Sequence, residues 1–207
     1  MDLRDFEKYF LNNKNISSFV GKTPVHRIED TQDTLFWSFF IIINGITEFE
    51  YIKMLQKIKI TGKQLKIEFL EKINKRKKEI TKKKLVKTLS SVEANLLEDM
   101  TTLETIVVLA FIEGVNILFV DERTFFYVEN DPDKEIHIIK NNVVVFENIE
   151  EIKKNRLQRY RVDKVLSSIS NYKLDDLKSM YSILAEPVKM TKQTLYDNIM
   201  NLCSIKN

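Results

Sequence analysis

The apolar positions along this chain form long runs before about residue 115 and short runs just after it. Before that point the runs are long and suit helices. The most apolar run, DTLFWSFFIIING at 33–45, has Asp33 or Thr34 as a candidate cap and Gly45 as its candidate end in a left-handed conformation. Because it is apolar on all sides, we expect this helix at the centre of a domain. The run covers nine positions, 35–43, all of them apolar except Ser38. It is far shorter than the ~20 residues that a membrane span needs.

Further helices are predicted on both sides of a short strand-rich region. They cover 3–12, 46–56, 63–89, 90–100, 101–114, 148–157, 174–185 and 191–203. The long helix at 63–89 carries the apolar stripe Leu65, Phe69, Leu70 and Ile73. The helix at 101–114 has Thr101 or Thr102 as its cap, Glu104 placed for a capping box and Gly114 as its end.

Between 115 and 148 the runs become short and rich in β-branched and aromatic residues. VNILFVD, TFFYVE, EIHIIKN and VVVFEN are separated by turn residues. This pattern predicts an antiparallel meander of three or four strands, and hence an α+β fold. We expect an N-terminal helix and irregular arm at 1–30, a main α+β domain at 31–164 and a C-terminal helical hairpin at 165–207.

Composition narrows the possible chemistry. Cys203 is the single cysteine, and the two histidines are His26 and His137. These residues provide neither a disulfide framework nor a metal-ligand cluster, so we expect no metal and no cofactor. A chain with this cysteine content and no apolar signal segment is expected inside a cell.

One segment carries most of the charge asymmetry. Between residues 72 and 87 there is one acid, Glu79, and there are nine basic residues: Lys72, Lys75, Arg76, Lys77, Lys78, Lys82, Lys83, Lys84 and Lys87. The segment is therefore +8, whereas the whole chain is +3, which leaves −5 for the rest. Such a run suits contact with phosphate backbones without base readout. It also suits a solvated helix face, and the sequence leaves both interpretations open.

The last two predicted helices resemble the SAP-like helix–extension–helix motif. The residues that carry the resemblance are YKLDDLKSM on the first helix and KMTKQTLYDNI on the second, although the glycine usual in the extension is absent. The resemblance implies nucleic-acid contact near Lys189 and Lys192, beside a helix start at Thr191. The alternative is a hairpin that packs on protein.

The stretch TQDTLFWSFF resembles the start of the central helix in ovarian-tumour-type and papain-like cysteine proteases, with Ser38 in the place of the nucleophile. The order of the later helix and strands resembles the ovarian-tumour type, in which the catalytic His follows the strand matching EIHII. Here that turn holds Asn141 and Asn142, and His137 lies within the strand. Ser38 and His137 are therefore weak catalytic candidates. Otherwise Ser38 is a small core residue whose hydroxyl bonds the carbonyl four residues back.

Over residues 31–202 the order of motifs resembles an uncharacterised family of giant and other large cytoplasmic DNA viruses. DTLFWSFFIIING, KIEFLEKINKRKKEI and TLETIVVLAFIEGVNILFVDERTFFYV carry this resemblance. It implies a viral protein of the host cytoplasm or the virion. We expect a non-enzymatic protein that contacts nucleic acid or acidic viral proteins through its basic helix. A protease-like fold, degenerate or with Ser38 as nucleophile, and a capsid cement protein are the alternatives.

Overall fold

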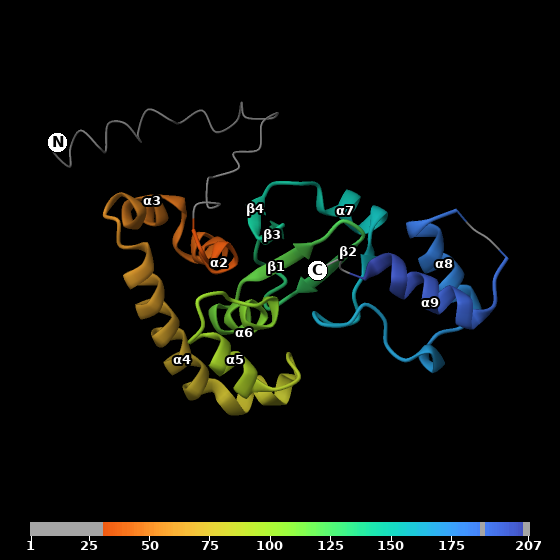
Figure 1. Cartoon of the computed structure of the whole chain (residues 1–207), viewed down its shortest axis with the longest axis horizontal. Helices are drawn as coiled ribbons and strands as arrows, with labels where there is room; N and C mark the ends of the chain where they lie inside the picture. Colours follow the sequence, from red (N-terminus) through yellow and green to blue (C-terminus); the bar gives the residue numbers. More distant parts are fainter. Residues whose placement is uncertain (1–30, 187–188, 205–207) are drawn as a thin grey trace.

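The α+β prediction is confirmed. The computed structural model describes residues 31–186 and 189–204, so the helix predicted at 3–12 and His26 lie outside the described residues. Figure 1 shows helices grouped before and after one central sheet. The helices are α2 (Thr34–Asn44), α3 (Ile46–Met54), α4 (Ile58–Lys83), α5 (Leu89–Asn95), α6 (Leu103–Glu113), α7 (Ile149–Asn155), η2 (Ile169–Asn171), α8 (Leu174–Leu184) and α9 (Lys192–Cys203). The strands are β1 (Asn116–Val120), β2 (Thr124–Val128), β3 (Ile136–Lys140), β4 (Val143–Val145) and β5 (Leu157–Gln158).

The predicted antiparallel meander is wrong in its topology. The sheet has five strands in the order β4-β3-β1-β2-β5, and it is mixed. β1 pairs antiparallel with β2, and β3 pairs antiparallel with β4. In contrast, β3 runs parallel to β1, and β5 runs parallel to β2. The chain therefore leaves β2 and crosses the start of β1 before it forms β3.

A buried asparagine at the start of β1 holds this crossing segment. The side-chain amide of Asn116 donates to the carbonyls of Asp131 and Lys134, at 2.5 and 3.0 Å. Its oxygen accepts from the backbone N–H groups of Asn130 and Asp131, at 2.8 and 3.1 Å. Because these four contacts satisfy backbone groups of the loop that passes the start of β1, β3 can form beside β1 instead of beside β2.

The two faces of the sheet pack against different helices. On one face Ile117, Phe119 and Ile139 join the main core, which also contains α2, α4 and α6. On the other face Leu118, Val120 and Ile138 pack around Ile152 of α7. β1 is buried at all five positions because it lies in the middle of the sheet with helices over both faces.

α2 is the central core helix that its composition predicts. Residues 35–40 are all buried, and the Trp37 ring lies 5.3 Å from Phe40 and 5.4 Å from Phe49, centroid to centroid. Asp33 caps the helix by accepting from the Phe36 N–H at 3.3 Å. Gly45 ends it with a φ of 87°, although its ψ of 160° lies outside the left-handed helical region that was predicted. No helix in the described ranges is long and apolar enough to cross a membrane.

The C-terminal helices α8 and α9 contact each other and form a second, smaller core. Leu177, Leu195 and Ile199 are buried within this core, and Leu157 of β5 joins it from the sheet. Cys203 is buried in the same cluster, and burial raises the pKa of its thiol. The hairpin is therefore packed on the sheet edge through β5.

Candidate nucleic-acid interface

The basic segment lies on α4, and the helix has one buried side and one open side. Its buried positions, Gly62, Lys66, Phe69, Ile73 and Ile80, are three, four or seven residues apart and form one stripe toward the core. On the helix surface opposite that stripe lie Lys75, Lys78 and Lys82, all exposed. Their spacing of three, four and seven residues places them in a single row.

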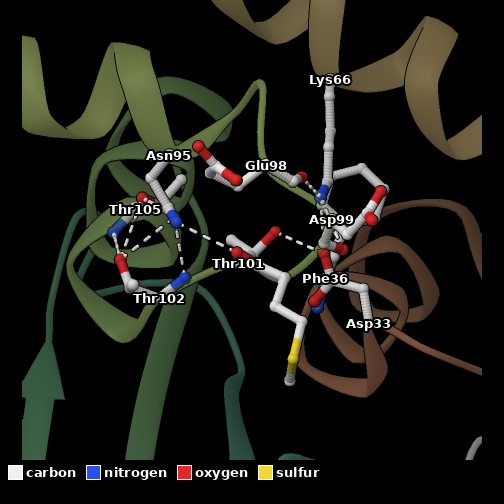
Figure 2. A network of polar contacts seen from close by, with 10 residues as sticks. Asp33, Phe36, Lys66, Asn95, Glu98, Asp99, Thr101, Thr102 and Thr105 are labelled. Carbon is white, nitrogen blue, oxygen red and sulfur yellow. Dashed lines mark hydrogen bonds and ion pairs between the residues drawn. The ribbon is translucent and has the colours of Figure 1, made fainter.

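A buried ion pair anchors α4 to the rest of the molecule. The Nζ of Lys66 lies 2.7 Å from Oδ2 of Asp33, and both side chains are less than a tenth exposed. Nζ also donates to the carbonyls of Glu98 and Asp99, and Thr101 donates its hydroxyl to Asp33 at 2.6 Å. Figure 2 shows how these groups converge from α4, the start of α2 and the α5–α6 connection. Sequence reasoning missed this pair, because an acid and a base 33 positions apart give no local signal.

A neighbouring hydrogen-bond network fixes the α5–α6 connection. Asn95 Oδ1 accepts from the N–H of Thr102 at 2.8 Å and from the Thr105 hydroxyl at 2.7 Å (Figure 2). Its side-chain amide donates to the Met100 carbonyl at 3.0 Å. The loop that receives Lys66 is thereby held in place, and α4 has a fixed position on the core.

Three of the nine predicted basic residues are paired with acids from other parts of the chain or from α4 itself. Lys72 pairs with Glu113 at 2.7 Å, and Lys77 pairs with Glu93 at 2.8 Å. Arg76 pairs with Glu79 one turn later, again at 2.8 Å. These charges are neutralised within the protein, and we remove them from the predicted interface.

Arg76 in particular is committed to packing. Its guanidinium binds both carboxylate oxygens of Glu79 at 2.8 Å, donates to the Ile112 carbonyl and lies 4.9 Å from the ring centroid of Phe111. The hydrogen bonds with Glu79 raise the pKa of Arg76 and lower the pKa of Glu79. The single arginine of the basic run is therefore held by the protein's own groups.

Six lysines of the run have no ion pair with any described residue: Lys75, Lys78, Lys82, Lys83, Lys84 and Lys87. All six are exposed. The hydrogen bond with Arg161 lowers the pKa of Asp163, and Lys87 lies close enough to add to this effect, so the charge of Lys87 is partly compensated. α4 ends at Lys83, Lys84 caps it with a φ of 52°, and the helix dipole favours cations at this end. The other five lysines, Lys75, Lys78, Lys82, Lys83 and Lys84, lie on the second half of α4 and at its C-terminal cap, and we call them the α4 lysine row. The hydrogen bonds with Arg76 lower the pKa of Glu79 and Lys83 adds to this effect to a smaller extent, so the charge of Lys83 is also partly compensated.

Lys189 and Lys192 do not belong to this surface. Lys189 is exposed and Lys192 is half-buried, beside the start of α9, where Thr191 caps the helix through the N–H of Thr194. Figure 1 places the α8–α9 hairpin at one end of the molecule and α4 at the other. The structure therefore separates the two predicted basic sites.

Ser38 and His137 do not form a nucleophile–base pair. Ser38 is fully buried in the second turn of α2, and its hydroxyl donates to the Asn142 carbonyl at 2.5 Å. The predicted bond to the carbonyl four residues back is therefore replaced by one to the β3–β4 turn, which lies against α2. Asn141 and Asn142 form this turn with φ angles of 51° and 63°. His137 is half-buried in β3 and lines an apolar pocket of about 710 Å³ with Ile41 and Ile42.

We expect the Ser38 hydroxyl to act as a structural group. Ser38→Ala removes the donor to the Asn142 carbonyl and is expected to lower the free energy of unfolding by about 1–3 kcal/mol. Urea denaturation measures this change, with exposed Ser179→Ala in α8 as the control. A Ser38→Ala variant as stable as the wild type would show that the hydrogen bond to the turn contributes little.

Comparison with known proteins does not place the chain in a family. No family model matches it, and no curated protein or solved structure is significantly similar to it. Within residues 31–186 and 189–204 no group of three or more His, Cys, Asp or Glu side chains could hold a metal ion. The α4 lysine row is the surface from which we argue function.

Proposed function

We propose that this protein binds nucleic acid through the phosphate backbone, using the α4 lysine row. The observation that carries the proposal is that some basic residues of α4 are paired with acids of the protein and others are not. Lys72, Arg76 and Lys77 are neutralised by acids of the protein. Among the unpaired lysines in the second half of the helix, Lys75, Lys78 and Lys82 lie in one row on its open side. Each phosphate contact releases condensed counterions, so several adjacent lysines give useful affinity at low salt.

The rigidity of α4 supports this proposal. The buried stripe runs from Gly62 to Ile80, and the Lys66–Asp33 pair fixes the first half of the helix. A lysine row on a fixed helix loses less conformational entropy on binding than a row on a mobile segment would. The fold therefore holds the helix that carries these lysines in place before nucleic acid binds.

The side chains on this surface favour binding without base readout. Direct readout in the major groove needs side chains placed to form paired hydrogen bonds with base edges, and Arg or Lys on guanine is the commonest such contact. Arg76 is occupied by Glu79 and the Ile112 carbonyl. Lysine ammonium groups act as point charges toward phosphates. The proposed binding is therefore indifferent to base sequence.

The setting we propose is a non-enzymatic role beside the genome of a large DNA virus, as the family resemblance implies. An acidic viral protein is the alternative partner for the same lysines. Oligonucleotide binding distinguishes these two candidate partners. If the partner is an acidic protein, free oligonucleotides stay unbound even at low salt.

Neutralising the row tests the proposal. The triple variant Lys75→Gln, Lys78→Gln and Lys82→Gln is expected to bind a mixed-sequence oligonucleotide at least about tenfold more weakly near 0.1 M salt, because three phosphate contacts are lost. Fluorescence anisotropy with a labelled oligonucleotide measures the affinity. Circular dichroism checks that the fold is retained.

The control triple variant changes the other half of the same helix. Lys57→Gln, Lys59→Gln and Lys63→Gln remove the same net charge from exposed residues at the start of α4. We expect this control to bind within about threefold of the wild type, since net charge alone acts weakly at distances beyond the Debye length. Equal losses in the two triple variants would refute a localised interface.

A further inference from the structure

Resting on the proposed function, we infer that the α4 lysine row selects double-stranded over single-stranded nucleic acid. Two independent features of the molecule lead to this substrate class. One is the lack of exposed aromatic groups on α4 on which bases could stack, and the other is the fixed spacing of the cations along one helix.

The aromatic residues near α4 are unavailable to bases. Phe69 is buried beneath Lys72, whose Nζ lies 5.0 Å from the ring centroid. Phe111 is half-buried beneath the Arg76 guanidinium. Among the described residues the exposed aromatic side chains are Tyr51, Phe146 and Tyr160, and none of them lies on α4.

The absence of exposed aromatic side chains on α4 weakens binding to single strands. Proteins that bind single strands combine a basic groove with aromatic platforms, and each stacked base contributes substantially to their affinity. The exposed side chains on the second half of α4 are lysines together with Glu71, Asn74, Glu79 and Thr81, and none of them is aromatic. A single strand would therefore gain electrostatic contacts only, and it would pay the entropy of ordering a flexible chain.

The geometry of the row suits a stiff, densely charged partner. Lys75 and Lys82 lie seven residues apart on one helix face, so their backbones are separated by about 10 Å. A duplex carries roughly one charge per 1.7 Å of its axis and holds its phosphates at fixed positions. Each contact with a duplex also releases more counterions, about 0.9 compared with about 0.7 for a single strand. Five lysines in a fixed surface thus gain more from a duplex.

Salt titration of two probes tests the inference. Wild-type protein is titrated by anisotropy against a short mixed-sequence duplex and against one of its strands, chosen without self-complementarity, between about 50 and about 200 mM salt. If all five lysines of the row contact phosphates, the slope of log K against log salt is about −4.5 for the duplex and about −3.5 for the single strand. We expect the duplex to bind more tightly across this range.

The outcomes separate the two proposals. Binding of neither probe at the lowest salt would refute the proposed function. Binding of the single strand as tightly as the duplex would refute only the selectivity for duplexes. As a second measurement, the Lys75, Lys78 and Lys82 triple variant should reduce the duplex slope by about 2.7, because three contacts are gone. An unchanged slope in that variant would place the duplex elsewhere on the protein and refute the inference.

Discussion

Replacing Lys66 by Met is expected to lower the free energy of unfolding by about 3–5 kcal/mol, because the carboxylate of Asp33 would stay buried without its partner. The substitution also leaves the carbonyls of Glu98 and Asp99 without the donor that they share. Methionine matches the aliphatic length of lysine, so packing changes little and the effect reports the lost charge. Urea denaturation followed by circular dichroism gives the free energy.

Two further variants make this prediction specific. Lys63→Met, one turn before Lys66 on the exposed surface of α4, should change stability by at most about 0.5 kcal/mol. The double variant Asp33→Asn with Lys66→Met removes both charges while keeping an oxygen to cap α2, and it should be more stable than Lys66→Met alone. If the double variant were no more stable than the single one, the loss would come from the unpaired carbonyls and not from the buried charge.

Replacing Asn116 by Leu is expected to destabilise the protein by at least about 3 kcal/mol, because four backbone groups lose their hydrogen-bond partner at once. The two carbonyls and two N–H groups concerned belong to Asn130, Asp131 and Lys134 in the crossing segment. A leucine of similar size can fill the space, so the loss reports hydrogen bonding and not a cavity. Urea denaturation again measures it.

The control for Asn116 is another asparagine in a different environment. Asn74 is exposed on α4, and Asn74→Leu should change stability by at most about 0.5 kcal/mol. If Asn116→Leu were equally mild, the hydrogen bonds of Asn116 would not determine the path of the crossing segment.

Both predictions concern buried polar side chains that hold distant segments of the chain together and that the sequence alone did not single out. Lys66 looks in sequence like one more lysine of a basic helix, yet it is 7% exposed and anchors α4. Asn116 looks like a polar interruption before an apolar strand, yet it is 1% exposed. In both cases the decisive partners come from distant segments.

The sequence by itself determined the local structure. Among the described residues apolar periodicity located the α-helices and four of the strands, because side-chain burial repeats with the geometry of each element. Its bounds were less exact, since the helix predicted at 63–89 is α4, Ile58–Lys83. Asp33 and Thr102 cap the starts of α2 and α6, and Gly114 caps the end of α6, as predicted, because caps act within one turn. The basic run could be identified from the sequence alone, since the local density of charged residues does not depend on tertiary contacts.

Tertiary structure alone decided the pairing. Strand order depends on contacts between residues far apart, so β3 lies parallel to β1 even though the turns favoured a meander. Likewise, Lys72 and Lys77 pair with Glu113 and Glu93 of other helices. The Ser38 hydroxyl donates to the carbonyl of Asn142, which lies 104 positions later in the chain. Non-local contacts of this kind leave no periodic signal in a sequence. They determine which lysines stay free, and therefore which part of α4 can meet a polyanion.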